Sequence, residues 1–166
     1  MNTLYIMRGY PGSGKSTWAN KKSNDTRAIV CSSDSYFMKD GKYEFDYTKL
    51  ASNHRKCYIK FLESMCLRKD IIIDNTNAKI SDIKTYLNMV NSLQKETSDN
   101  YRVRIVTVKY NSIDEAIAHR KDQPDNKNVS GDIIKNIANI IEAFPSSELI
   151  NIFPDIVFEF ETIEHK

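Results

Sequence analysis

Residues 9–16 constrain this chain more than any other segment, because they read Gly-Tyr-Pro-Gly-Ser-Gly-Lys-Ser and fit the pattern G-x-x-x-x-G-K-[ST]. Glycines let the backbone turn so that successive N–H groups point inward at an anion. A helix that begins near the lysine adds its positive N-terminal end, and the serine hydroxyl can coordinate Mg²⁺. The pattern therefore predicts a site for ATP and Mg²⁺, formed by Gly9, Gly12, Ser13, Gly14, Lys15, Ser16 and Thr17.

Apolar and helical segments alternate along the chain. The loop lies between an apolar run at residues 3–7 and a helical stretch at about 15–22, although an ordinary strand-to-helix turn is the alternative interpretation. Further strands are predicted at residues 28–31, 71–73, 103–108 and 156–158, and helices at 47–67, 80–95, 113–120 and 133–143. This alternation predicts an α/β fold with a parallel sheet covered on both faces. Ligands bind beyond the carboxyl ends of the strands in such sheets.

Two aspartates follow predicted strands and so are expected at the same sheet edge as the loop. Asp34 follows the second strand, where a carboxylate can accept the proton of an attacking hydroxyl, or can equally cap a helix. Asp74 follows the third strand, where it could hold Mg²⁺ directly or through water, or serve in a plain turn. The short polar side chains of Asn75 and Asn77 suit a loop that faces phosphates or substrate.

A basic helix end leads into a segment without apolar side chains, Asp-Gln-Pro-Asp-Asn-Lys-Asn at residues 122–128. Beside a phosphate site, this composition predicts a basic lid at about residues 119–130, although a solvated charged loop is the alternative. Arg120 could stabilise the charge that develops on a transferred phosphoryl group, and Lys121 and Lys127 are further cations there.

The composition sets outer limits. A length of 166 residues predicts one domain covering residues 1–166, and a net charge of +2 argues neither for nor against a nucleic-acid partner. No apolar run approaches the roughly 20 residues of a membrane helix, and the first residues lack a signal-peptide pattern, so we expect a cytoplasmic enzyme without membrane contacts. The three cysteines fit no zinc spacing, and nothing indicates a protein partner.

Taken together, these segments resemble the P-loop kinases that include phage polynucleotide 5′-hydroxyl kinases and related eukaryotic kinase domains. The resemblance spans roughly residues 3–143. It rests on Gly-Tyr-Pro-Gly-Ser-Gly-Lys-Ser-Thr-Trp-Ala at 9–19, Ser-Asp-Ser-Tyr-Phe at 33–37, Gly-Lys-Tyr-Glu-Phe-Asp at 41–46, Ala-Ser-Asn-His at 51–54, Asp-Asn-Thr-Asn at 74–77 and Ala-His-Arg at 118–120. The phosphate loop is common to many ATPases, whereas its combination with Tyr-Glu-Phe and Asp-Asn-Thr-Asn is more specific.

The resemblance implies a five-stranded parallel sheet sandwiched by helices, ATP as donor, and the 5′-hydroxyl of DNA or RNA as acceptor. It implies that Lys15 and Ser16 bind phosphates and Mg²⁺, that Asp34 is the general base, and that Arg120 is a lid arginine. The chain departs from the family at two points. Phe37 stands where a cation for the substrate phosphate is expected, and the lid offers only lysines in place of a second arginine, a poorer clamp for phosphate. The remaining substrate candidates are Tyr36, Lys39, Asn75, Asn77 and Lys127.

Three functional hypotheses follow. The first is a polynucleotide 5′-hydroxyl kinase, and the second is a kinase that acts on a small molecule such as a nucleoside, nucleotide, sugar or antibiotic. The third belongs to another class, an ATP-binding switch module without phosphotransfer. We rank the third lowest, because two carboxylates beside a basic lid favour chemistry over binding alone.

Overall fold

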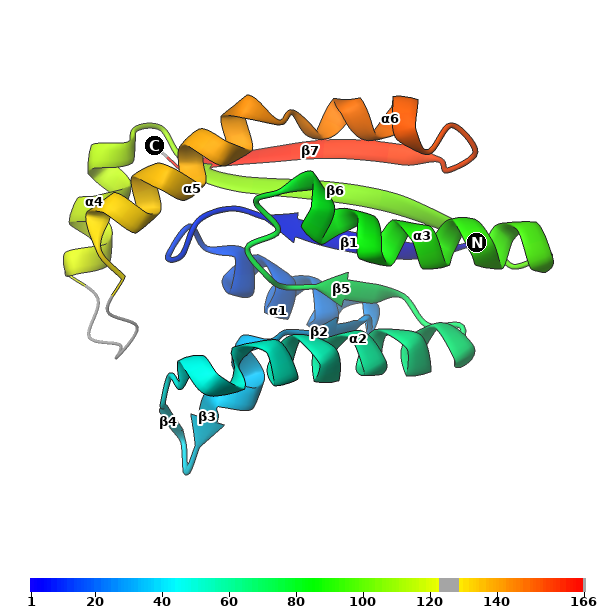
Figure 1. The fold of residues 1–166 in the computed structure, drawn as a ribbon, viewed down its shortest axis with the longest axis horizontal. Coiled ribbons are helices and arrows are strands. Elements are labelled where there is room, and N and C mark those ends of the chain that lie inside the picture. The colour runs from blue at the N-terminus through cyan, green and yellow to red at the C-terminus, as the bar shows by residue number, and fades with distance from the viewer. Residues whose placement is uncertain (123–128, 166) are drawn as a thin grey trace.

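Five parallel strands form the central sheet of the protein in its computed structural model, which describes residues 1–122 and 129–165 (Figure 1). The order across the sheet is β2-β5-β1-β6-β7. The strands are β1 (Asn2–Arg8), β2 (Ile29–Cys31), β5 (Ile71–Ile73), β6 (Tyr101–Tyr110) and β7 (Phe158–His165). Because every pair is parallel, all five carboxyl ends lie at one edge of the sheet. The predicted α/β fold with a five-stranded parallel sheet is confirmed.

Helices cover the sheet and connect its strands (Figure 1). They are α1 (Lys15–Thr26), α2 (Leu50–Cys66), α3 (Ile80–Glu96), α4 (Ile113–Lys121), α5 (Gly131–Ala143) and α6 (Leu149–Ile152). The described residues also form the short 3₁₀ turns η1 (Asp34–Phe37), η2 (Tyr47–Lys49) and η3 (Ser146–Glu148). Within the described ranges, none of the helices has the length and apolar character needed to cross a membrane.

The central strand β1 divides its side chains between two cores. Leu4 and Ile6 are fully buried on the face that α2 and α3 cover. Tyr5 and Met7 point to the opposite core, where they meet Ala19 of α1. This alternation follows from the two-residue period of a strand, and burial on both faces explains why the run is almost wholly apolar.

The last strand is longer than the sequence pattern predicts. We expected residues 156–158, whereas β7 runs from Phe158 to His165 and pairs with β6 along its whole length. Its sequence, Phe-Glu-Phe-Glu-Thr-Ile-Glu-His, carries polar residues because β7 lies at the edge of the sheet. Glu159 there accepts hydrogen bonds from Arg104 of β6. These charged residues hide the strand from a search for apolar runs, and it carries the end of the chain back to the phosphate loop.

A small hairpin that the sequence did not predict lies between β2 and α2. Its strands are β3 (Met38–Lys39) and β4 (Lys42–Tyr43), joined by a turn at Asp40 and Gly41, both of which have positive φ. The hairpin is anchored by Phe37, which is only 3% exposed and contacts the rings of Tyr43 and Phe45. Phe37, where a substrate-binding cation was expected, is therefore an apolar anchor.

A buried arginine binds neighbouring segments together at the edge of the sheet where the carboxyl ends of the strands lie. The guanidinium of Arg8, at the end of β1, donates to the backbone carbonyls of Asn77, Ala78 and Phe144 and to the hydroxyl of Ser146. Only 1% of the residue is exposed, and desolvation lowers the pKa of its guanidinium despite the opposing effect of Asp82. Arg8 thus holds the segment after β5 and the end of α5 beside the phosphate loop.

Candidate active site

The phosphate loop follows β1 directly and leads into α1, as predicted. Gly12 and Gly14 have φ values of 79° and 98°, which side chains rarely adopt. A Cβ at Gly9 would lie 2.5 Å from the carbonyl oxygen of Val108 and 2.7 Å from Oγ of Ser13, so this position has no room for a side chain. The glycines therefore serve the geometry that the sequence pattern predicts.

Lys15 lies within the loop that precedes it. The residue is 9% exposed, and its ammonium group donates to the carbonyl of Tyr10 at 3.0 Å. Tyr10 is itself buried, and its hydroxyl accepts a hydrogen bond from the backbone N–H of Tyr110 at 2.5 Å. Burial is the main reason that the pKa of the Tyr10 hydroxyl is raised, so this group stays neutral. The hydrogen bond to Tyr10 thus holds the ammonium group of Lys15 inside the phosphate loop.

Ser16 and Asp74 meet at the first turn of α1. The serine hydroxyl donates to Oδ2 of Asp74 at 2.7 Å, and Asp74 is 8% exposed. A hydroxyl and a carboxylate are hard oxygen ligands of the kind that Mg²⁺ prefers, so this pair fits the predicted metal role. The structure thus brings together two residues 58 positions apart in the sequence.

Asp34 lies at the same edge, after β2. It is the first residue of η1, and the N-cap position belongs to Ser33, so Asp34 does not cap this turn. The hydroxyl of Tyr43 donates to Oδ1 of Asp34 at 3.4 Å. The hairpin therefore contacts the predicted general base, a contact that sequence reasoning missed, although Tyr-Glu-Phe was part of the family resemblance.

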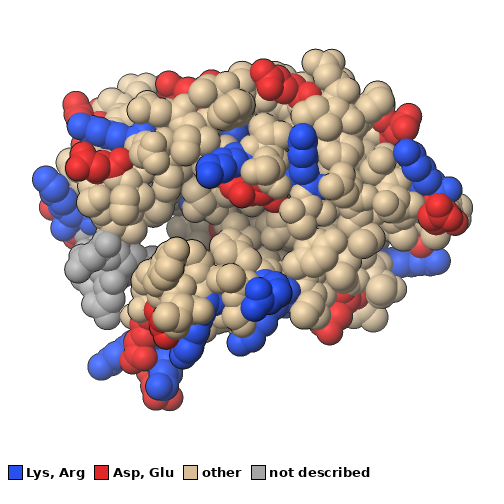
Figure 2. All heavy atoms as spheres, viewed as in Figure 1, with Lys and Arg blue, Asp and Glu red and all other residues tan. Residues whose placement is uncertain are grey.

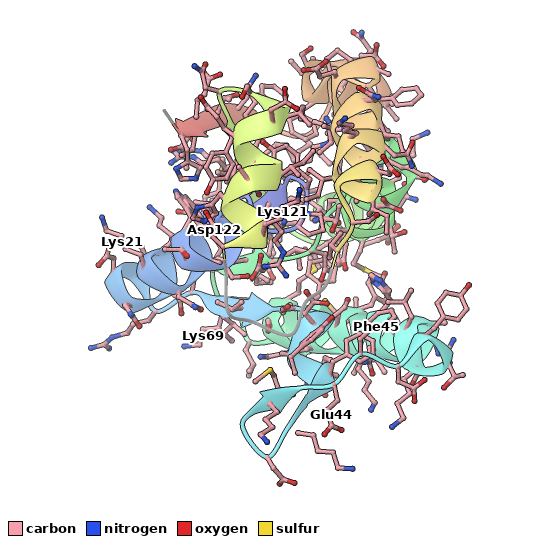
Figure 3. The ribbon with its side chains drawn as sticks, turned by 90° about the vertical axis from the view of Figure 1, so that its left-hand side faces the viewer. Lys21, Glu44, Phe45, Lys69, Lys121 and Asp122 are labelled. Atoms are coloured by element: carbon pink, nitrogen blue, oxygen red, sulfur yellow. The ribbon has the colours of Figure 1, made fainter. Side chains whose placement is uncertain are left out.

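Arg120, near the end of α4, lies over the loop. The residue is 9% exposed, and its Cδ is 2.9 Å from the place that a Cβ on Gly12 would occupy. The contact with Gly12 places Arg120 beside the phosphate loop, and its role as a lid arginine stays a prediction. Figure 3 shows Lys121 and Asp122 at the end of the same helix. The rest of the predicted lid lies only partly in the described structure, because residues 123–128, with Lys127, are outside it.

Two cavities meet at Asp34. The first, of about 600 Å³, is lined by the phosphate loop and by the cations Lys15, Lys21 and Arg120. The second, of about 510 Å³, lies between α2 and α3 and is lined by His54, Tyr58, Ser81, Asp82, Thr85 and Tyr86, among others. Asp34, Asn75 and Thr76 line both. The described lining of the second cavity contains two carboxylates and no lysine or arginine.

The predicted substrate residues fall into two groups. Asn75 and Asn77 line the second cavity, but both amides also hold the backbone. Asn75 accepts from the N–H of Ser33 at 2.9 Å, and Asn77 donates to the carbonyl of Met7 at 2.7 Å. The second group, Tyr36 and Lys39, is absent from the described lining of either cavity and lies on the outer surface around the hairpin.

A histidine at the end of β7 forms a hydrogen bond with the backbone of the phosphate loop. Nε2 of His165 is 2.8 Å from the carbonyl oxygen of Ser13, and because a carbonyl only accepts, Nε2 carries the proton. Tyr110 lies between His165 and His119, with ring centroids 4.9 and 5.2 Å away, and all three line the first cavity. No sequence signal pointed to His165, whereas His119 was part of the Ala-His-Arg resemblance but received no role.

The parallel sheet, the phosphate loop and the carboxylates at its edge define a P-loop kinase fold. A family model described as an AAA domain matches residues 4–141, and the chain belongs to this family. It is also 36% identical over 86 residues to human NEDD4-binding protein 2, an alignment that covers 51% of this chain and 5% of the relative.

Solved structures support the same fold. A chain of the Pnkp1/Rnl/Hen1 RNA repair complex is similar with a TM-score of 0.68 and 17% identity, over 86% of this chain and 44% of that one. A gluconokinase from Sinorhizobium meliloti 1021 is similar with a TM-score of 0.58 and 9% identity, over 98% of this chain and 82% of the gluconokinase. The chain thus spans less than half of the first structure and a small part of the human relative.

Proposed function

We propose that this chain transfers the γ-phosphate of ATP to a hydroxyl group, with the 5′-hydroxyl end of a DNA or RNA strand as the acceptor. The observation that carries the proposal is the place of Asp34, at the junction of a cation-lined cavity and a cavity whose described lining has no lysine or arginine. Phosphates belong in the first cavity, and an uncharged hydroxyl belongs in the second. The RNA repair complex among the similar structures supports the choice of acceptor.

The reaction follows from the arrangement of the chain's own groups. The carboxylate of Asp34 accepts the proton of the acceptor hydroxyl while its oxygen forms a bond to the γ-phosphorus. The bond between the γ-phosphorus and the β–γ bridging oxygen breaks, and ADP leaves. Lys15 and Arg120 stabilise the negative charge on the transferred group. Ser16 and Asp74 would hold Mg²⁺, which neutralises charge on the β- and γ-phosphates.

A small-molecule kinase is the second candidate. The described lining of the second cavity has no lysine or arginine, which suits an acceptor without a phosphate group, such as a sugar or nucleoside. The gluconokinase among the similar structures supports this alternative.

An acceptor screen with γ-labelled ATP and Mg²⁺ tests these proposals. We expect label on the 5′ ends of single-stranded DNA or RNA that carries a 5′-hydroxyl, and none on the same strands with a 5′-phosphate. Label on sugars or nucleosides but on no strand would instead establish the second candidate. Binding of ATP without transfer to any acceptor would contradict both and favour the switch hypothesis.

We expect His165→Ala to weaken ATP binding about five- to tenfold, because the loss of a net hydrogen bond of about 1 kcal/mol loosens the loop at Ser13. Isothermal titration with ATP–Mg²⁺ measures this change. Glu164→Ala is the matched control, because Glu164 directly precedes His165, is exposed, and makes a 4.0 Å ion pair with Lys109. Equal affinities for the His165→Ala variant and the unaltered protein would show that this contact does not shape the loop.

A further inference from the structure

An exposed surface of mixed aromatic and basic character lies beside the second cavity. We call it the hairpin surface, and it consists of Tyr36, Met38, Lys39, Lys42, Phe45 and Tyr47. Phe45 is 56% exposed and Tyr47 is 78% exposed, so two large aromatic rings face solvent close to each other in the sequence. Exposed apolar patches of this kind are typical of interaction sites. Figure 3 shows Phe45 and Glu44 on the connection between the hairpin and α2.

The segment that carries this surface is the basic part of the chain. Residues 36–60 contain six Lys or Arg and three Asp or Glu, a net charge of +3, which exceeds the +2 of the whole chain. In Figure 2, Lys and Arg atoms lie on the hairpin at the lower left and over the first half of α2, with acidic atoms among them. Among the lysines and arginines of residues 36–60, the described structure shows an ion pair for Lys49, whose ammonium group lies 3.8 Å from Asp46. Lys39 and Lys42 therefore offer their charges to a ligand.

The hairpin surface is fixed relative to the reacting group. Phe37 contacts the rings of Tyr43 and Phe45, and the N–H of Glu44 donates to the carbonyl of Phe37 at 2.9 Å. Tyr43 in turn donates to Asp34. A ligand on this surface is thus held at a defined place relative to the predicted base.

The surface also adjoins the second cavity. Leu50 and His54, from the first turns of α2, line this cavity, and Tyr47 lies only three residues before Leu50. At the rise of a 3₁₀ turn, three residues correspond to about 6 Å. A strand whose terminal nucleoside occupies the cavity would reach Tyr47 within about two nucleotides, at a spacing of roughly 3.4 Å per nucleotide.

We propose that the hairpin surface binds the single-stranded segment that follows the acceptor end, with bases stacked on Tyr47 and Phe45 and phosphates beside Lys39 and Lys42. This inference rests on the proposed function. Exposed rings interleaved with cations suit unpaired bases and their backbone, whereas a duplex keeps its bases stacked on one another. The surface also gives a place to the predicted substrate residues Tyr36 and Lys39, which lie outside both cavities.

Binding is tested without ATP in the Asp34→Asn background, so that no phosphate is transferred during the measurement. The probe is a fluorescent single-stranded DNA or RNA 12-mer with a 5′-hydroxyl, and its anisotropy gives Kd at several salt concentrations. We expect Lys39→Glu combined with Lys42→Glu to raise Kd at least tenfold and to reduce the salt slope by about 1.4. The matched control reverses Lys69 and Lys95, exposed lysines at the opposite edge of the sheet, and leaves Kd unchanged.

Stacking is tested separately with Tyr47, which is 78% exposed, so that its removal takes little packing from the folded protein. Tyr47→Ala is expected to weaken strand binding about tenfold, and Tyr47→Phe to retain it, because only the ring is needed. An unchanged Kd in both the charge-reversal variant and Tyr47→Ala would overturn the inference, as would equal affinity for a blunt duplex of the same length.

The two proposals fail in distinguishable ways. If the unaltered protein phosphorylates strands and the hairpin variants keep the same KM for them, the hairpin surface is wrong and the proposed function stands. If the unaltered protein binds single strands through this surface but transfers no phosphate to them, the proposed acceptor is wrong and the surface stands. KM for ATP is expected to stay unchanged in every hairpin variant, because none of its residues lines the first cavity in the described structure.

Discussion

Replacing Asp34 by asparagine is expected to lower kcat for phosphoryl transfer by about 10²- to 10⁴-fold and to leave the affinity for ATP within about twofold. Asparagine has the same size and can still accept a hydrogen bond from Tyr43, so the local structure is retained. It cannot accept the proton of an acceptor hydroxyl. The affinity is expected to persist because the phosphate loop, with Lys15 and Ser16, is unaltered.

Single-turnover transfer from labelled ATP, together with titration of ATP binding, separates these two effects. Asp155→Asn is the matched control, because Asp155 is an exposed aspartate that belongs to the described lining of neither cavity, and this variant should keep full activity. If Asp34→Asn retains more than about a tenth of the kcat, Asp34 is not the general base. Its place at the junction of the cavities would then reflect positioning alone.

The main outline of this site could be predicted from the sequence because its signals are local. The glycine spacing at residues 9–16 specifies the loop, and an apolar run followed by an acid specifies a strand end. Parallel strands then bring Asp34 and Asp74 to one edge without any knowledge of side-chain contacts. The hydrogen bond between Ser16 and Asp74 is consistent with this arrangement of strand ends.

The parts that escaped prediction depend on contacts between distant segments. His165 reaches Ser13 across 152 positions, and the strand that carries it is mostly polar because it lies at an edge. The two-residue strands of the hairpin are too short to show any periodicity, so the contact from Tyr43 to Asp34 had no signal. Phe37 read as a missing cation, because a sequence position does not reveal that a side chain is buried.

Arg8 is the other residue whose role a sequence cannot reveal, and Arg8→Met is expected to lower the free energy of unfolding by about 3 kcal/mol or more. Methionine is similar in length but donates no hydrogen bond. The carbonyls of Asn77, Ala78 and Phe144 would lose their donor in a buried place. In a domain of this size, a loss of about 3 kcal/mol lowers Tm by roughly 6–12 °C.

Urea unfolding measures this change, and Arg102→Met is the matched control. Arg102 lies on β6 with 47% of its side chain exposed and contacts Glu159 at 3.4 Å, so its removal should change stability by at most about 1 kcal/mol. Equal effects of the two substitutions would show that the buried hydrogen bonds of Arg8 add nothing to stability. A larger effect at Arg8 would show that its buried hydrogen bonds stabilise the fold.

The same hydrogen bonds connect the site, because Arg8 joins the segment after β5 to the phosphate loop that begins at Gly9. The backbone N–H of Gly9 also donates to the carbonyl of Thr76, so loosening that segment would disturb the phosphate loop and Asp74 together.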